Sequence, residues 1–99
     1  MKRLVKKAQR GDKEALMQLV MEAKDEYYRL AFTYMENEHD AMDALENMVV
    51  ILYEKMEQLQ KPESFYSWSK TILVNECRAL LRKRSKIIFL DEEQAATIV

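Results

Sequence analysis

The sequence has few of the residues that make turns or cross-links. Its 99 residues include one glycine (Gly11), one proline (Pro62), one cysteine (Cys77) and one histidine (His39). A many-stranded sheet needs turn residues, so this scarcity argues against one, and the prevalence of Leu, Met, Ala, Glu, Lys, Gln and Arg favours helices. A single cysteine cannot form a disulfide within the chain, which fits a reducing cytoplasm.

The same scarcity argues against an enzyme or a metal protein. His39 falls in an expected loop without a second histidine or a cysteine near it, whereas zinc needs three or four such ligands. No glycine-rich phosphate loop occurs, and neither a serine nor Cys77 has a histidine base in its sequence context. Helix capping explains Asp40 and Asp43 more simply than acid–base chemistry does. We therefore expect a binding function, with no catalytic residue, metal or cofactor.

Long apolar runs are also absent. The basic residues 1–7 are not followed by the apolar core of a signal peptide, and no run approaches the roughly 20 residues that span a bilayer. These features predict a cytoplasmic protein without a membrane-inserted segment.

Charge is distributed unevenly, although the formal net charge is only −1. Residues 1–13 carry six basic residues and one acid, residues 14–60 carry three basic residues and eleven acids, and residues 61–86 carry seven basic residues and two acids. This distribution favours one acidic and one basic face, and the basic face would suit nucleic acid. Ordinary solvated helix faces are the alternative.

Apolar residues spaced three and four apart predict helices along most of the chain. A short helix is expected over about 2–10, and three long helices over about 12–35, 40–60 and 63–84. Gly11 suits a left-handed cap at the end of the first helix, and Asp12 suits the N-cap of the next. We therefore predict an all-α fold, a compact bundle of three long helices plus a short N-terminal helix. Residues 1–85 would form this domain, and residues 86–99 would start an interdomain linker.

Four short segments occur in a characteristic order and spacing. They are AQRGDKEAL at 8–16, DAMDALEN at 40–47, PESFYSWSKTILVN followed by ECRALLRK at 62–83, and FLDEE at 89–93. In this order they resemble the region-two domain of extracytoplasmic-function (ECF) sigma factors, whose patterns include "G-D-x-x-A-F", "D-A-E-D-x-x-Q-E" and "F-x-x-W-L-x-x-I-x-x-N". The resemblance covers residues 4 to about 92 and implies a helical domain of a transcription initiation factor.

The sequence departs from the family pattern at several positions. Met42, Glu46 and Asn47 stand where the family usually has an acid, a Gln and a Glu, and Ser69 replaces the usual Leu. The family also has a second helical domain that reads the −35 element, and no such domain is expected within these residues. Met42, Glu46 and Asn47 fall in the segment that binds RNA polymerase in the family, so these three departures bear on that role.

The resemblance implies that the segment 40–53 docks on the clamp helices of the β′ subunit of core RNA polymerase. An acidic outer helix face suits a basic partner, and apolar side chains would supply the anchor. The candidate contacts are Asp40, Asp43, Glu46, Asn47, Met48 and Val49. The alternative is that Asp40 and Asp43 only cap the helix and Met48 only packs.

The connector 58–64 corresponds in the family to a loop that captures a flipped base of the non-template strand of the promoter −10 element. Polar groups would bind the base edge, Phe65 or Tyr66 would stack on it, and the following basic helix would track phosphates. The candidate DNA contacts are Gln58, Gln60, Lys61, Tyr66, Lys70, Asn75, Arg78, Arg82 and Lys83. The alternatives are a plain turn, a solvated helix end, and a structural role for Asn75 on the apolar stripe that contains Trp68.

The expected function is therefore that of a domain that binds core RNA polymerase and helps to melt the −10 element, with an anti-sigma factor as a further partner. A helical protein-interaction module, such as a sigma-like decoy or an anti-sigma-binding adapter without DNA recognition, is the first alternative. A general nucleic-acid-binding bundle is the second.

Overall fold

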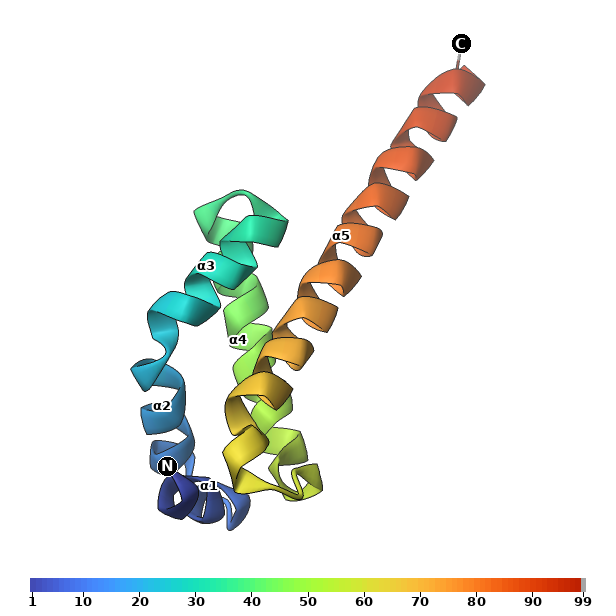
Figure 1. The fold of residues 1–99 in the computed structure, drawn as a ribbon. Coiled ribbons are helices and arrows are strands. Elements are labelled where there is room, and N and C mark those ends of the chain that lie inside the picture. The colour runs from blue at the N-terminus through green and yellow to red at the C-terminus, as the bar shows by residue number, and fades with distance from the viewer. Residues whose placement is uncertain (99) are drawn as a thin grey trace.

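A computed structural model describes the backbone of residues 1–98 and the side chains of residues 1–86. Every regular element in residues 1–98 is helical (Figure 1). In chain order the elements are α1 (Lys2–Gln9), α2 (Lys13–Glu22), α3 (Lys24–Met35), α4 (Glu38–Lys55), the 3-10 turns η1 (Met56–Gln58) and η2 (Pro62–Ser64), and α5 (Phe65–Ile98). The predicted all-α fold with a short N-terminal helix is confirmed.

Helices α3, α4 and α5 pack against one another, while α1 packs against α2 and both 3-10 turns at one end of the bundle (Figure 1). The apolar stripes predicted from the sequence meet in one core, whose largest fully buried side chains include Leu19, Tyr27, Met48, Leu52, Met56, Phe65 and Leu73. Trp68 is partly buried and packs on this core. The centroid of its ring lies 6.4 Å from that of the Phe65 ring.

The two sequence signals between α1 and α2 act as predicted. Gly11 has φ of +95°, which an L side chain rarely adopts, so it lets the chain leave α1. The carboxylate of Asp12 accepts a hydrogen bond of 3.1 Å from the backbone N–H of Ala15 and so caps α2.

The long helix predicted over 12–35 is interrupted at Ala23. The N–H of Ala23 donates to the carbonyl of Val20 (3.1 Å) instead of continuing the α-helical pattern to Leu19. The Leu19 carbonyl accepts instead from the hydroxyl of Tyr66 on α5 (3.1 Å). A tertiary hydrogen bond therefore satisfies the backbone group that the break frees, which explains why no glycine or proline marks it.

Helix α4 begins two residues before the predicted start at Asp40. Glu36 ends α3 in the left-handed conformation, with φ of 63°, and Asn37 is the N-cap of α4. The Asn37 Oδ1 accepts from the backbone N–H of Asp40 (2.8 Å), and the Asn37 Nδ2 donates to the Asp40 carboxylate (2.8 Å). Asp40 is thus the third helical residue, bound through its N–H and its carboxylate to the side chain of the N-cap Asn37, rather than the cap itself.

Helix α5 continues past residue 84, which is the end predicted from the sequence. The chain has no glycine or proline after Pro62, so no residue in this region stops a helix. Residues 86–98, expected to begin a linker, continue the backbone helix, whereas Val99 lies outside the described residues. In the part of the chain that is described, no helix is both long and apolar enough to cross a bilayer.

One buried polar pair joins α3 to α5. The hydroxyl of Ser69 donates to the carbonyl of Tyr66 (2.9 Å) and lies 2.7 Å from the hydroxyl of Tyr27, and both side chains are fully buried. Because the single Ser69 proton is used on the carbonyl, Tyr27 donates to Ser69. Burial raises the pKa of Tyr27 to about 12, so its hydroxyl keeps its proton.

Candidate protein and nucleic-acid interfaces

The outer face of α4 presents acidic side chains to solvent. Asp43 and Glu46 are exposed and lie about one helical turn apart, as an acidic docking face requires. His39 lies 3.6 Å from the carboxylate of Asp43. Met48, in contrast, is 0% exposed and packs in the core, so its assignment as a partner contact is corrected.

Two other candidate contacts on α4 are engaged within the domain. Asp40 binds Asn37 in the capping pair and forms an ion pair with Arg84 of α5. The Asn47 amide donates to the carboxylate of Glu76, also on α5 (3.1 Å). These side chains hold α5 against α4, so of the six candidate contacts Asp43, Glu46 and Val49 are the ones left to face a partner.

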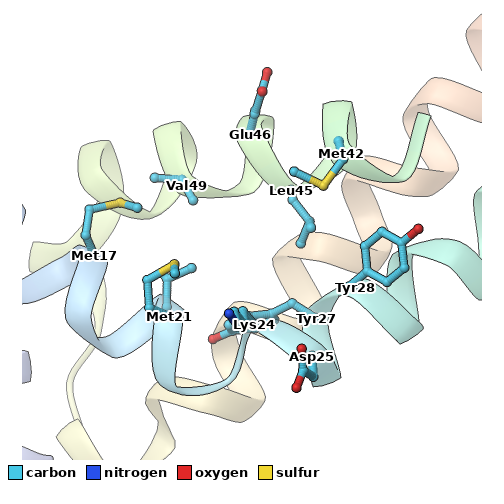
Figure 2. A pocket seen from close by; sticks show the side chains of 11 residues that line it. Met17, Met21, Lys24, Asp25, Tyr27, Tyr28, Met42, Leu45, Glu46 and Val49 are labelled. Atoms are coloured by element: carbon cyan, nitrogen blue, oxygen red, sulfur yellow. The ribbon is translucent and has the colours of Figure 1, made fainter. Parts of the chain in front are cut away.

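An apolar groove lies beside this acidic face, between α4 and the α2–α3 pair. Its volume is about 470 Å³, and it is lined by Met17, Val20, Met21, Lys24, Asp25, Tyr27, Tyr28, Met42, Leu45, Glu46 and Val49. Figure 2 shows the methionines of α2 facing Leu45 and Val49 of α4, while the carboxylate of Glu46 points away from the groove. Apolar side chains therefore form its walls and an acid stands at its rim.

Three methionines of the groove are unusually accessible. Met17, Met21 and Met42 are 42%, 53% and 43% exposed. Methionine side chains are flexible and polarisable, and they are common on surfaces that bind helices of varied sequence. Met17 and Met21 were not predicted from the sequence as surface residues. The available signal was the count of seven methionines, of which the core takes only Met35, Met48 and Met56.

The connector between α4 and α5 brings together the polar residues predicted to hold a base. Gln58, Gln60 and Lys61 are exposed and line a shallow depression of about 300 Å³ together with Leu59, Ser64 and Trp68. Trp68, which lies on the apolar stripe predicted from the sequence, also contributes to this surface. The depression thus has polar groups and one aromatic edge, as a base-binding surface requires.

The two aromatic residues expected to stack on a base are not available for it. Phe65 is fully buried, and the hydroxyl of Tyr66 donates to α2, at the carbonyl of Leu19. Burial and the nearby carboxylate of Glu22 raise the pKa of Tyr66. Phe65 and Tyr66 are therefore corrected to structural residues, and Trp68 is the aromatic side chain beside the connector.

The exposed side of α5 carries a polar and basic stripe. Asn75, Arg78 and Arg82 are exposed and spaced so that they share one helix face, with the exposed Lys83 next to it. Asn75 therefore lies in solvent and not on the buried stripe, which removes the structural alternative for it. Lys70 is engaged elsewhere, because its ammonium group binds Glu26 (2.7 Å) and lowers the pKa of that carboxyl.

Two groups could carry other chemistry, a cluster of possible metal ligands and the thiol of Cys77, and each is constrained by its surroundings. His39, Asp40 and Asp43 place ligand atoms within 4.8 Å of one another, but Asp40 is already neutralised by Arg84. Cys77 is buried, and burial raises the pKa of its thiol, which disfavours the reactive thiolate.

Comparisons with known proteins agree with the resemblance drawn from the motifs. The family model "Sigma-70 region 2" matches residues 19–87. The chain is 33% identical over 87 residues to "RNA polymerase sigma factor SigV" of Bacillus subtilis (strain 168), covering 88% of this chain and 52% of that protein. It is 27% identical over 96 residues to "ECF RNA polymerase sigma factor SigW" of the same organism, covering 97% and 51%. The chain thus spans about half the length of these relatives, and it belongs to the sigma-70 family as a region-two domain of the ECF type.

Proposed function

We propose that this domain binds core RNA polymerase and contacts the −10 element of promoter DNA during transcription initiation. The observation that carries the proposal is the separation of two surfaces within one family domain. The apolar groove is built by α2, α3 and α4, whereas the connector and the basic stripe belong to the α4–α5 turn and to α5. A domain that holds polymerase and DNA together needs two such surfaces.

The groove and the acidic face of α4 form the proposed polymerase surface. An apolar groove of this kind accepts the apolar side chains of a partner helix, and methionine walls adapt to them. Asp43 and Glu46 are both exposed, and they would attract basic residues of that partner helix. The clamp helices of the β′ subunit are the partner that the family implies.

Reversing both charges, Asp43→Lys with Glu46→Lys, is expected to weaken core binding about tenfold or more, in the range of about 1–3 kcal/mol for loss of central contacts. Equilibrium titration of labelled domain with core polymerase measures the effect. The matched control is Glu54→Lys with Glu57→Lys, which changes net charge equally at exposed positions outside the groove. Equal affinity for the wild type and the first variant, with helix content retained, would refute this docking surface.

The connector and the α5 stripe form the proposed DNA surface. Gln58, Gln60 and Lys61 would bind the edge of one unstacked base in the depression beside Trp68. Arg78, Arg82 and Lys83 would follow the phosphates of the same strand.

Replacing Arg78, Arg82 or Lys83 with glutamine should weaken binding of single-stranded −10 DNA by a similar factor for every sequence. Each change should also lower the slope of log affinity against log salt by about 0.7, the value for one phosphate contact on a single strand. Fluorescence titrations at two salt concentrations, with oligonucleotides that differ at single −10 positions, measure both quantities. Lys70→Gln is the matched control, because Glu26 already pairs with Lys70.

Changes in the connector should behave differently. Gln60→Ala or Lys61→Ala should alter the preferred base at one position, because the connector would read the base. If Arg82→Gln changes base preference and the connector variants do not, the two roles are assigned to the wrong elements.

The groove also favours a second function, that of a protein-interaction module without DNA recognition. An apolar groove with three exposed methionines would accept a partner helix, including one from an anti-sigma factor. Transcription assays separate the two functions, since an interaction module would bind polymerase or an anti-sigma factor without directing initiation.

A further inference from the structure

Gln9, the last residue of α1, binds the connector, which lies beside α1 at the same end of the bundle. Its side-chain Nε2 donates to the backbone carbonyl of Met56 (3.1 Å) and to that of Leu59 (2.7 Å), 47 and 50 residues further along the chain. An amide nitrogen has two protons, so both are used on these carbonyls. Met56 begins η1, and Leu59 directly follows it.

These carbonyls lie where the regular pattern of α4 ends. Helix α4 stops at Lys55, and carbonyls at a helix end lack partners within the helix. The Met56 carbonyl accepts from the N–H of Leu59 (3.2 Å) in the 3-10 turn, and Gln9 adds a second donor to it. Gln9 also supplies a donor to the Leu59 carbonyl, at the point where the backbone turns extended. One side chain thus clamps both ends of the turn.

Helix α1, which carries Gln9, is itself anchored in the domain. Val5 and Ala8 of α1 are buried, and α1 packs against both η1 and η2. Gly11 and the cap at Asp12 determine where α1 ends, and therefore where Gln9 stands. The side chains of Met56 and Leu59, whose carbonyls Gln9 binds, are buried in the core.

We propose that Gln9 is a positioning residue for base recognition, which sets the backbone of the connector so that its polar side chains face the promoter base. This rests on the proposed DNA-reading function of the connector. Gln58, Gln60 and Lys61 are exposed, so the backbone that Gln9 holds decides where they point. A binding site on a loop needs such support from a second layer of residues. Gln9 would not touch DNA itself.

The test replaces Gln9 with methionine, which has a similar length and no donor. Discrimination is the ratio of affinities for single-stranded −10 oligonucleotides with the preferred and a substituted base. We expect Gln9→Met to reduce this ratio by about fivefold, within the range by which one base changes affinity. The salt slope and the affinity for core polymerase should match those of the wild type. Gln9→Asn keeps the amide on a shorter side chain and should give an intermediate ratio.

Met35→Ala is the matched control, because it removes buried side-chain atoms at the end of α3 and changes no residue of α1 or of the connector. It should lower the melting temperature and keep the discrimination of the wild type. Wild-type discrimination in Gln9→Met, or an equal loss in Met35→Ala, would overturn the positioning role. Absence of discrimination in the wild-type domain would instead overturn the proposed reading by the connector, and the positioning role with it.

Discussion

Replacing Met21 with aspartate is expected to weaken binding of core RNA polymerase by about a hundredfold, or roughly 2–3 kcal/mol. Met21 is 53% exposed in the free domain and forms part of the apolar groove. A partner helix seated in this groove would remove the new carboxylate from water, which is costly. The groove is already lined by two carboxylates, Asp25 and Glu46, and one cation, Lys24, so the new carboxylate would make it more negative.

Two controls make this measurement specific. Met21→Leu keeps an apolar side chain in the groove and should bind polymerase within about threefold of the wild type, as expected for a volume-conserving change. Gln18→Asp adds the same charge to an exposed position of α2 that does not line the groove, and should have a similarly small effect. Equal losses in Gln18→Asp and Met21→Asp would show a general charge effect and would remove the groove from the interface.

Restoring the leucine that the family usually has at position 69 is expected to destabilise this domain by about 3 kcal/mol. Ser69 is fully buried, so a larger side chain overpacks the core at a cost of about 1–3 kcal/mol. Leucine also leaves the buried hydroxyl of Tyr27 without its acceptor, which costs about 1–3 kcal/mol. In a chain of this size, 3 kcal/mol lowers the melting temperature by roughly 15 °C. Thermal unfolding followed by circular dichroism measures the change.

A second substitution isolates the polar part of this effect. Tyr27→Phe combined with Ser69→Leu removes the orphaned hydroxyl and should recover about 1 kcal/mol or more of the loss. Ser67→Leu, at an exposed position of the same helix, should change stability by less than about 1 kcal/mol. If Ser69→Leu melts at the wild-type temperature, the Tyr27–Ser69 pair does not explain this departure from the family.

The local signals in the sequence were sufficient for the helical class and for most of the helix starts. The apolar spacing identified the buried faces, and Gly11 and Asp12 act at the α1–α2 boundary as predicted. These signals depend on contacts within four residues, which the sequence displays directly. The break at Ala23 had no such signal, because it depends on a hydrogen bond from Tyr66, 43 residues further along the chain.

For the candidate surfaces, too, some features followed from the sequence and others were decided only by the tertiary structure. The sequence identified the acidic face of α4, the polar connector and the basic stripe of α5, because charge and exposure follow from residue type and helical spacing. Only the tertiary structure decided that Met48 is core, that Asn47 binds Glu76, and that Asp40 pairs with Arg84. It also decided that methionines of α2 and α4 share one groove and that Gln9 holds the connector. Each of these depends on which helix faces meet, and spacing along a single helix cannot specify its neighbour.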